Sequence, residues 1–206
     1  MSLAPATVVL VLAGGRGRRM GGTDKARVHL AGQTLLERAV ARLAPQGDAL
    51  LVSANGDAAR FASHLTMIPD DLPDHPGPLA GLLAGLYHIA AHHPAIAWMA
   101  SAPVDCPFLP RDLVARLHAG RAGAPLARAA SGGRVHPVAG LWPVALRHAL
   151  RRALTEQGER RVGVWGTAQG AVDVLWQTAP YDPFFNVNTS DDLVLAEAIL
   201  AAHPDA

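Results

Sequence analysis

The sequence predicts an α/β fold in which helices cover both faces of a mostly parallel central sheet. Short apolar runs alternate along the chain with segments whose apolar residues recur at helical spacing, which is typical of a parallel sheet covered by helices. The run at 7–12, Thr-Val-Val-Leu-Val-Leu, is apolar almost throughout, as expected of a strand buried on both faces. The chain has 206 residues, 50% of them hydrophobic and 17% charged, which favours one domain spanning residues 1–206.

The first half of the chain has the clearer pattern. After the strand at 7–12, apolar residues recur at helical spacing from Leu35 to Leu43, and Pro45-Gln46-Gly47 ends this helix. The remaining elements expected in this half are strands at 49–53, 66–68 and 95–100, a short helix at 58–65 and a longer helix at 79–92.

The second half has less regular signals. Helices are expected at 110–117 and 144–157, strands at 124–129, 135–142 and 172–176, and a polar loop at 158–161. A final helix is expected at 190–203, where Ser190 is a suitable cap and Asp191 and Asp192 favour the positive end of the helix dipole.

Composition excludes several classes of protein. The net charge is only +1, so no global positive field points to nucleic acid, and a small partner is expected. The single cysteine, Cys106, excludes an internal disulfide framework and fits a reducing compartment. Apolar stretches fall short of the roughly 20 residues that span a bilayer, and the first basic cluster follows the first apolar run, unlike a secretory signal. We therefore expect a cytoplasmic protein without a membrane partner.

A glycine-rich basic segment, LAGGRGRRMGGTDK, occupies residues 12–25 directly after the first strand. Glycines allow positive φ angles and let the main chain approach a ligand closely, with backbone N–H groups free to point at an anion. The dinucleotide fingerprint G-x-G-x-x-G fails because Met20 occupies its last glycine position. The P-loop pattern fails because Lys25 is followed by Ala26 rather than by Ser or Thr.

The same segment carries Arg16, Arg18, Arg19 and Lys25, more positive charge than a monophosphate requires. Several cations stabilise the charge that moves onto a leaving pyrophosphate, so the segment is predicted to bind a nucleoside triphosphate. A solvated glycine-rich turn is the alternative, which the position directly after a buried strand disfavours.

A carboxylate, Asp105, follows the strand at 95–100 and lies between Pro103 and Pro107, which hold the backbone extended. Ligands of open parallel sheets bind beyond the carboxyl ends of the strands, so Asp105 should share an edge with the glycine-rich segment. Mg²⁺ is commonly held by one or two carboxylates together with substrate phosphates, and we expect Asp105 to be its ligand. A structural turn residue before the helix at 110–117 is the alternative.

Asn55 and Asp70 end the second and third strands and should face the same edge. An amide and a carboxylate offer the donors and acceptors that reading a base or a ribose requires. Both residue types are also common turn formers.

These residues resemble a known family, the molybdenum cofactor guanylyltransferases. The resemblance spans nearly the whole chain and is carried by Leu12-Ala13-Gly14-Gly15, Arg19-Met20-Gly21-Gly22, Asp24-Lys25, Pro76-Gly77-Pro78-Leu79-Ala80-Gly81, Asp105-Cys106-Pro107, His136-Pro137, Glu159-Arg160-Arg161 and Phe185-Asn186-Val187-Asn188-Thr189. Where the family often follows the final Asn-Thr with Pro, this chain has Ser190, which still suits a helix cap.

The resemblance implies a Rossmann-like nucleotidyltransferase fold, with a nucleotide-binding N-terminal half and an acceptor-binding C-terminal half. It implies transfer of GMP from GTP to the terminal phosphate of molybdopterin, with release of pyrophosphate. The nucleotide would be held by Leu12, Ala13, Gly14, Gly15, Lys25, Asn55, Asp70 and Asp105. Asp105 would also bind Mg²⁺, and Lys25 and Arg19 would stabilise the phosphate charge beside it. Other molybdenum cofactor biosynthesis proteins and acceptor molybdoenzymes are the implied protein partners.

The acceptor end of the site has weaker candidates. Arg160, Arg161, Asn186 and Asn188 are polar, loop-borne and near the ends of late strands, so they are the expected molybdopterin contacts. The two arginines are equally compatible with a solvated face. His136 is interpreted as a structural histidine with substrate contact as the alternative.

Other features receive structural interpretations. His88 and His92 are four residues apart on an expected helix, but a surface pair is favoured over a metal site because no third ligand is at hand. Cys106 is interpreted as a buried thiol rather than a nucleophile. Three functional alternatives remain, namely a sister enzyme using CTP or another acceptor, a catalytically silent nucleotide-binding escort, and a nicotinamide-dependent oxidoreductase.

Overall fold

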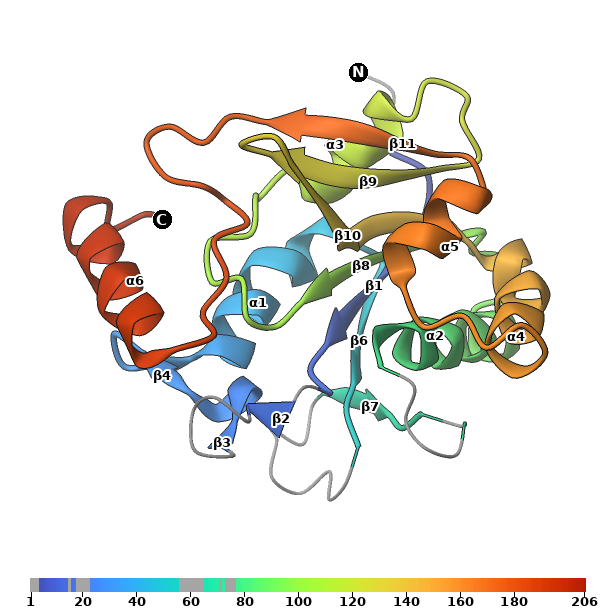
Figure 1. Cartoon of the computed structure of the whole chain (residues 1–206), viewed down its shortest axis with the longest axis horizontal. Helices are drawn as coiled ribbons and strands as arrows, with labels where there is room; N and C mark the ends of the chain where they lie inside the picture. Colours follow the sequence, from blue (N-terminus) through green and yellow to red (C-terminus); the bar gives the residue numbers. More distant parts are fainter. Residues whose placement is uncertain (1–3, 15, 18–22, 56–64, 71, 73–76) are drawn as a thin grey trace.

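The computed structural model describes residues 4–14, 16–17, 23–55, 65–70, 72 and 77–206 (Figure 1). Its centre is a seven-stranded sheet in the order β11-β9-β10-β8-β1-β6-β7. The central strand β1 (Thr7–Leu12) pairs in parallel with β6 (Ala49–Ser53) on one side and with β8 (Trp98–Pro103) on the other. Next to β6, the strand β7 (Thr66–Ile68) continues the parallel arrangement to the edge.

The other half of the sheet is mixed. The long strand β10 (Arg134–Pro143) runs antiparallel to both of its neighbours, β8 and β9 (Leu126–Ser131). The edge strand β11 (Ala171–Trp176) is again parallel to β9. The sheet is therefore mostly parallel, as expected, with one antiparallel strand inserted at β10.

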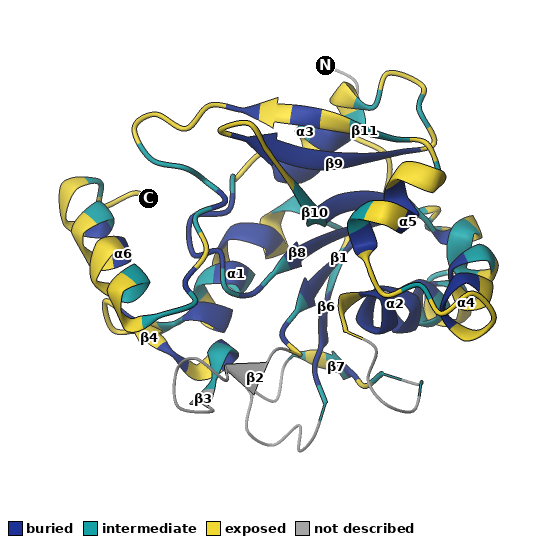
Figure 2. Ribbon diagram, in the orientation of Figure 1, coloured by how far each residue is buried: buried dark blue, intermediate teal, exposed yellow. Residues whose placement is uncertain are grey.

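Helices cover both faces of the sheet, as predicted. Alternate residues of β1 point to opposite faces of the sheet. Val9 and Val11 belong to one apolar cluster, and Val8 and Leu10 belong to the other. The first cluster contains α1 (Leu35–Leu43), α3 (Leu113–Gly120) and α6 (Ser190–Ala202), and the second contains α2 (Pro78–His92), α4 (Arg147–Thr155) and α5 (Val162–Ala168). Figure 2 shows this division as buried inner faces of the helices against a buried sheet, with α6 the most exposed helix.

The short elements lie mainly between β1 and α1. They are the hairpins of β2 (Arg16–Gly17) with β3 (Thr23–Asp24) and of β4 (His29–Leu30) with β5 (Gln33–Thr34), and the 3₁₀ turns η2 (Lys25–Arg27), η3 (Ala44–Gln46) and η5 (Val144–Leu146).

Several boundaries differ from the sequence-based ones. Strand β8 begins and ends three residues later than 95–100, and α3 and β9 are also displaced toward the C-terminus. The helix expected at 144–157 is divided into η5 and α4, and α5 was not predicted. The helix expected at 58–65 lies outside the described residues except for its last position.

The prediction that Ser190 caps the final helix is wrong. The cap is Thr189, whose extended backbone and side chain complete a capping box with Asp192. The Thr189 hydroxyl accepts from the Asp192 N–H at 3.1 Å, and the Asp192 carboxylate accepts from the Thr189 N–H at 2.9 Å. The helix therefore starts one residue after the hydroxyl that satisfies its first free donors.

Among the described residues, no helix is both long and apolar enough to cross a membrane.

Candidate active site

A cavity of about 520 Å³ lies beyond the carboxyl ends of β1, β6, β7 and β8. This is the edge at which open parallel sheets bind ligands, and the volume falls in the range of small-molecule sites. Its other walls are the start of α2, the first six residues of β10 and the segment before α6. The residues expected from the sequence that line it are Leu12, Gly14, Lys25, Asn55, Asp70, Asp105 and Asn186.

Backbone hydrogen bonds fix Asp105 at this edge. Strand β8 ends at Pro103, which is level with Leu12 in β1. The next residue, Val104, donates its N–H to the Leu12 carbonyl at 3.1 Å. The Asp105 carbonyl in turn accepts from the N–H of Val187 at 2.8 Å, which brings the segment before α6 against the end of β8. The carboxylate therefore belongs to a rigid junction of three distant segments.

Lys25 reaches the same carboxylate from the other side. It begins the turn η2, whose cap is Asp24, and the Asp24 side chain accepts from the Ala26 N–H at 3.2 Å. The Lys25 ammonium donates to Asp105 Oδ2 at 2.7 Å, and both side chains are 15% exposed. It is also hydrogen-bonded to Oδ1 of Asn188. Leu12, Gly14 and Lys25 of the glycine-rich segment thus lie on the same cavity as Asp105, as expected.

Asn186 completes what we call the Lys25 cluster, made of Lys25, Asp105, Asn186 and Asn188. Its amide donates to Asp105 Oδ1 at 2.9 Å, so both carboxylate oxygens are engaged. The backbone N–H of Asn188 donates to Asp192 at 2.9 Å, which ties the cluster to the first turn of α6. Both asparagines were expected from the sequence to contact the acceptor. In the structure they contact Lys25 and Asp105, the residues expected to bind phosphate and the metal ion.

Asn55 and Asp70 form a second polar pair at the ends of β6 and β7. The Asn55 amide donates to Asp70 Oδ2 at 2.9 Å, and the Asp70 N–H donates to Asn55 Oδ1 at 3.0 Å. The hydroxyl of Ser53 lies 3.4 Å from the other Asp70 oxygen. The prediction that these two side chains share an edge with Asp105 is confirmed, because all three line the cavity.

The start of α2 packs tightly against the strand ends. Gly77 has a φ of +82°, which a side chain would disfavour, and Pro78 begins the helix. A Cβ at Gly81 would lie 2.5 Å from both Leu12 Cδ2 and Ser53 Oγ, so only glycine lets the helix approach this closely. The positive end of the helix dipole is thereby held beside the cavity.

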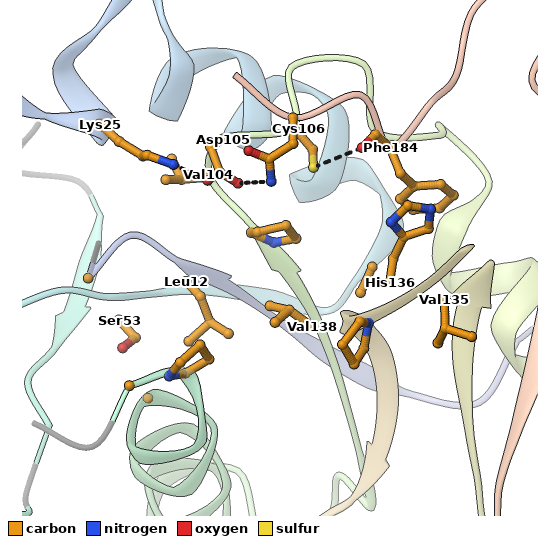
Figure 3. A pocket seen from close by; sticks show the side chains of 18 of the residues that line it. Leu12, Lys25, Ser53, Val104, Asp105, Cys106, Val135, His136, Val138 and Phe184 are labelled. Carbon is orange, nitrogen blue, oxygen red and sulfur yellow. Dashed lines mark hydrogen bonds and ion pairs between the residues drawn. The ribbon is translucent and has the colours of Figure 1, made fainter. Parts of the chain in front are cut away.

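The far end of the cavity is formed by β10 and Phe184. Figure 3 shows Lys25 and Asp105 close together at one end and His136 beneath Phe184 at the other. The rings of His136 and Phe184 are stacked with centroids 4.6 Å apart. His136 Nε2 lies 2.7 Å from the Ser131 hydroxyl. Burial lowers the pKa of His136, with Asp182 opposing and Arg134 adding to this effect.

Other residues singled out from the sequence lie elsewhere. Ala13 is buried and donates its N–H to the Ser53 carbonyl at 2.8 Å. Arg160 donates to the Leu154 carbonyl at 3.0 Å, and Arg161 pairs with Glu159 at 3.3 Å while its side chain is 76% exposed. Neither arginine lines the cavity. Gly15, Arg18 and Arg19 lie outside the described residues, and for Arg16 only the backbone is described.

The structure describes both features that were given a structural interpretation from the sequence. Cys106 is buried, its thiol lies 3.6 Å from the Phe184 carbonyl, and burial raises its pKa well above the usual value, so it stays protonated. The rings of His88 and His92 are 4.4 Å apart. Among the described residues, no group of three or more His, Cys, Asp or Glu side chains is arranged to hold a metal ion.

The cavity residues that were not anticipated from the sequence include Ser53, Arg134 and Phe184. Asp182, which lies behind the cavity wall, was also missed. Asp182 and Phe184 are part of the run Tyr-Asp-Pro-Phe-Phe, which directly precedes Asn186. Their position next to this expected site residue was the one sequence feature that could have indicated them.

Comparison with known proteins gives consistent results. Residues 9–169 match the family model described as a MobA-like NTP transferase domain. The chain is 52% identical over 200 residues to a molybdenum cofactor guanylyltransferase of Nitrobacter hamburgensis, covering 96% of each chain. It is 53% identical over 195 residues to the one of a Bradyrhizobium species, covering 93% of this chain and 92% of the relative.

Among solved structures, the molybdopterin-guanine dinucleotide biosynthesis protein A of Archaeoglobus fulgidus is similar with a TM-score of 0.72 and 25% identity, over 95% of this chain and 99% of that one. A 2-C-methyl-D-erythritol 4-phosphate cytidylyltransferase of Thermus thermophilus shares the fold with a TM-score of 0.64 and 22% identity, over 93% of this chain and 98% of that one.

Proposed function

Because the chain belongs to the molybdenum cofactor guanylyltransferase family, we propose that it transfers GMP from GTP to the terminal phosphate of molybdopterin. The products are pyrophosphate and molybdopterin guanine dinucleotide. The observation that carries the proposal is the contact of Lys25 with Asp105 inside a cavity that also contains the Asn55–Asp70 pair. The cation proposed to bind phosphate, the carboxylate proposed to bind the metal ion and the groups proposed to contact the nucleoside all line one cavity.

The reaction is a displacement at phosphorus. An oxygen of the molybdopterin phosphate forms a bond to the α-phosphorus of GTP, and the bond from that phosphorus to the oxygen leading to the β-phosphorus breaks. A phosphate monoester is already anionic at neutral pH, so the site needs no general base.

Lys25 supplies positive charge where the transferring and leaving phosphates carry negative charge. In the structure its ammonium is hydrogen-bonded to Asp105 and Asn188 at the cavity wall, and these two contacts fix its position. The side chain is long enough to turn from the carboxylate to a phosphate oxygen when nucleotide binds. Arg19, which lies outside the described residues, is proposed to assist it.

Asp105 is the residue that would hold Mg²⁺. The donor set fits this ion, because a single half-buried carboxylate leaves the remaining positions to phosphate oxygens and water. Bound there, the ion would withdraw charge from the phosphates during transfer. The amide of Asn186, which donates to Asp105 Oδ1 at 2.9 Å, orients the carboxylate.

The nucleoside is proposed to lie against Leu12, Gly14 and the Asn55–Asp70 pair. The Asn55 amide donates to the Asp70 carboxylate and its carbonyl oxygen accepts from the Asp70 backbone N–H, which fixes the orientation of the pair. The N-terminal half thus binds the nucleotide, and β10 with the segment before α6 faces the acceptor. Arg160 and Arg161 remain proposed acceptor contacts, and the chain comes near the cavity two residues after Arg161, where a Cβ on Gly163 would lie 3.6 Å from the cavity residue Pro137. The lone buried Cys106 agrees with the cytoplasmic location expected from the sequence.

Pyrophosphate release from GTP, CTP and ATP, each with and without molybdopterin and Mg²⁺, tests the proposal. Release is expected with GTP when both molybdopterin and Mg²⁺ are present, and each omission should reduce it to background. A preference for CTP would instead support a sister enzyme. Tight GTP binding without any turnover would support a nucleotide-binding escort.

A further inference from the structure

A chain of hydrogen bonds runs from Asp182 through Ser131 to His136, behind the wall of the cavity. Asp182 Oδ1 accepts from the Ser131 hydroxyl at 2.7 Å and from the Phe184 N–H at 2.9 Å. A serine hydroxyl has one proton, and here it is given to the carboxylate. Ser131 Oγ can therefore only accept at its second contact, the one with His136 Nε2 at 2.7 Å. The proton on that histidine must lie on Nε2.

This assignment determines what His136 offers to the cavity. A neutral imidazole with its proton on Nε2 has an unprotonated Nδ1, which is a hydrogen-bond acceptor. Burial lowers the pKa of His136 and so keeps the ring neutral. In the described part of the chain, no donor contacts Nδ1. The residue thus combines a satisfied nitrogen on the protein side with an acceptor left for a ligand.

Ring stacking and hydrogen bonds fix the part of the cavity wall that carries His136, so the acceptor nitrogen has a defined direction. The His136 ring is stacked on Phe184, with a ring-plane angle of 19°. Two residues later, the Val138 carbonyl accepts from the Ser101 hydroxyl at 2.6 Å, and that hydroxyl accepts from Trp142 Nε1 at 2.8 Å. A register shift between His136 and Gly140 lets β10 turn this segment toward the cavity. Both sides of Pro137 are therefore fixed.

We propose that His136 determines acceptor specificity, with Nδ1 accepting a hydrogen bond from an N–H group of the acceptor's heterocycle. The inference rests on the proposed function, which places the nucleotide at the Lys25 and Asn55 end of the cavity. His136 lies at the opposite end, as Figure 3 shows. A reduced pterin presents ring N–H and amino donors, which match a neutral acceptor nitrogen, whereas a phosphate would not.

Kinetics of three variants test this role. His136→Phe keeps the stack on Phe184 but removes Nδ1, and we expect the KM for molybdopterin to rise about tenfold, the size of one lost hydrogen bond, with the KM for GTP unchanged. His136→Asn places an amide near the position of Nδ1 and should recover part of the loss. His92→Phe, on the exposed end of α2, is the matched control and should behave as wild type.

The tautomer is measured independently of catalysis. A ¹⁵N–¹H correlation spectrum of the imidazole in the ligand-free protein should show the proton on Nε2 of His136, and Ser131→Ala should weaken this preference. A proton on Nδ1 in the wild type would overturn the proposal whether or not any variant folds.

The kinetic outcomes separate the two levels of the account. An active wild type whose molybdopterin KM is unaffected by His136→Phe contradicts the role of His136 but leaves the guanylyltransferase function intact. A rise in the KM for GTP instead would place the nucleotide base at this end of the cavity and also overturn the inference. A wild type that does not turn over GTP with molybdopterin contradicts the proposed function itself.

Discussion

The Lys25 ammonium lies 2.7 Å from the Asp105 carboxylate, although 80 positions separate the two residues in the chain. The contact joins the turn after the glycine-rich segment to the end of β8. It pairs a positively charged with a negatively charged side chain, each 15% exposed. In the proposed reaction each group exchanges this partner for another, Lys25 for a phosphate and Asp105 for a metal ion.

Replacing Asp105 by Asn is expected to lower kcat/KM by about 10²- to 10³-fold, the usual cost of losing one electrostatic group at a transition state. The amide keeps the shape of the carboxylate but has no charge for a metal ion or for Lys25. Pyrophosphate release at saturating Mg²⁺ measures the effect. Asp112→Asn is the control, because Asp112 is exposed and its side chain makes no cap bond at α3. An Asp105→Asn enzyme within twofold of wild type would be incompatible with this role.

Lys25 is the only lysine among the 206 residues, which makes it selectively addressable. An amine-directed acylating reagent should react at Lys25 and at the terminal amine, and acylation of Lys25 should abolish turnover because it removes the positive charge. GTP with Mg²⁺ should slow both the labelling of Lys25 and the loss of activity. Peptide mass spectrometry locates the label. Inactivation that proceeds equally fast with and without GTP would show that the nucleotide does not cover Lys25.

Gly81→Ala should destabilise the fold by about 1–3 kcal/mol, since overpacking of this kind typically costs that much. The added Cβ would meet Leu12 and Ser53 at 2.5 Å. Gly166→Ala is the matched control in another helix, because a Cβ there would lie 3.6 Å from Arg128, an ordinary contact. That change should be neutral or stabilising by up to about 1 kcal/mol, given the helix propensity of alanine. Urea unfolding compares the two, and equal stability would contradict the close packing of α2.

Folding stability should fall as pH drops below about 6.5, the ordinary pKa of histidine. Burial, and then Arg121, lowers the pKa of His118 in the folded chain, so the unfolded chain binds its proton first. Stability is therefore complete above the unfolded pKa and is lost as pH falls through the folded one. The pKa values of His88 and His136 are lowered as well, which adds to the slope.

The variant His118→Gln isolates one contribution to this slope. Its amide can still reach the Thr7 hydroxyl, which His118 Nε2 contacts at 2.8 Å in the structure. Urea unfolding between pH 8 and pH 5.5 should show a shallower decline for the variant than for wild type. Identical pH dependence would mean that His118 does not resist protonation in the fold.

The parallel half of the sheet was predictable because its strands are short and apolar. The bounds of β1, β6 and β7 coincide with the apolar runs in the sequence. Strand β8 was placed too early because the apolar run begins inside a turn, where the Ile96 N–H donates to the His93 carbonyl at 2.9 Å. The strand then continues to Pro103 because it must reach the level of Leu12 in β1.

Helix α5 was not predictable from local preference. It has seven residues and two glycines, a composition that favours a loop. Tertiary contacts hold it instead, since Trp165 stacks on Trp142 with centroids 5.7 Å apart and Arg128 donates to the Gly163 carbonyl at 3.0 Å. At α5, tertiary packing therefore outweighs the low helix propensity of the sequence.

The convergence of Asp105, Asn55 and Asp70 followed from strand order, but the placement of the asparagines at 186 and 188 did not. Asp105, Asn55 and Asp70 each lie two residues beyond the end of a strand in the parallel part of the sheet, so their convergence follows from topology. Asn186 and Asn188 reach the Lys25 cluster through the backbone bond from Val187 to the Asp105 carbonyl, at 2.8 Å. No local pattern indicates such a contact between segments so far apart.

A crystal structure of the protein with Mg²⁺ and a non-hydrolysable GTP analogue tests the central claim most directly. We expect the triphosphate within hydrogen-bond distance of Lys25 Nζ, the metal ion bound to Asp105, and the 2.7 Å ion pair between these residues opened. A nucleotide bound elsewhere, or one bound in this cavity with the Lys25–Asp105 pair still closed, would contradict it.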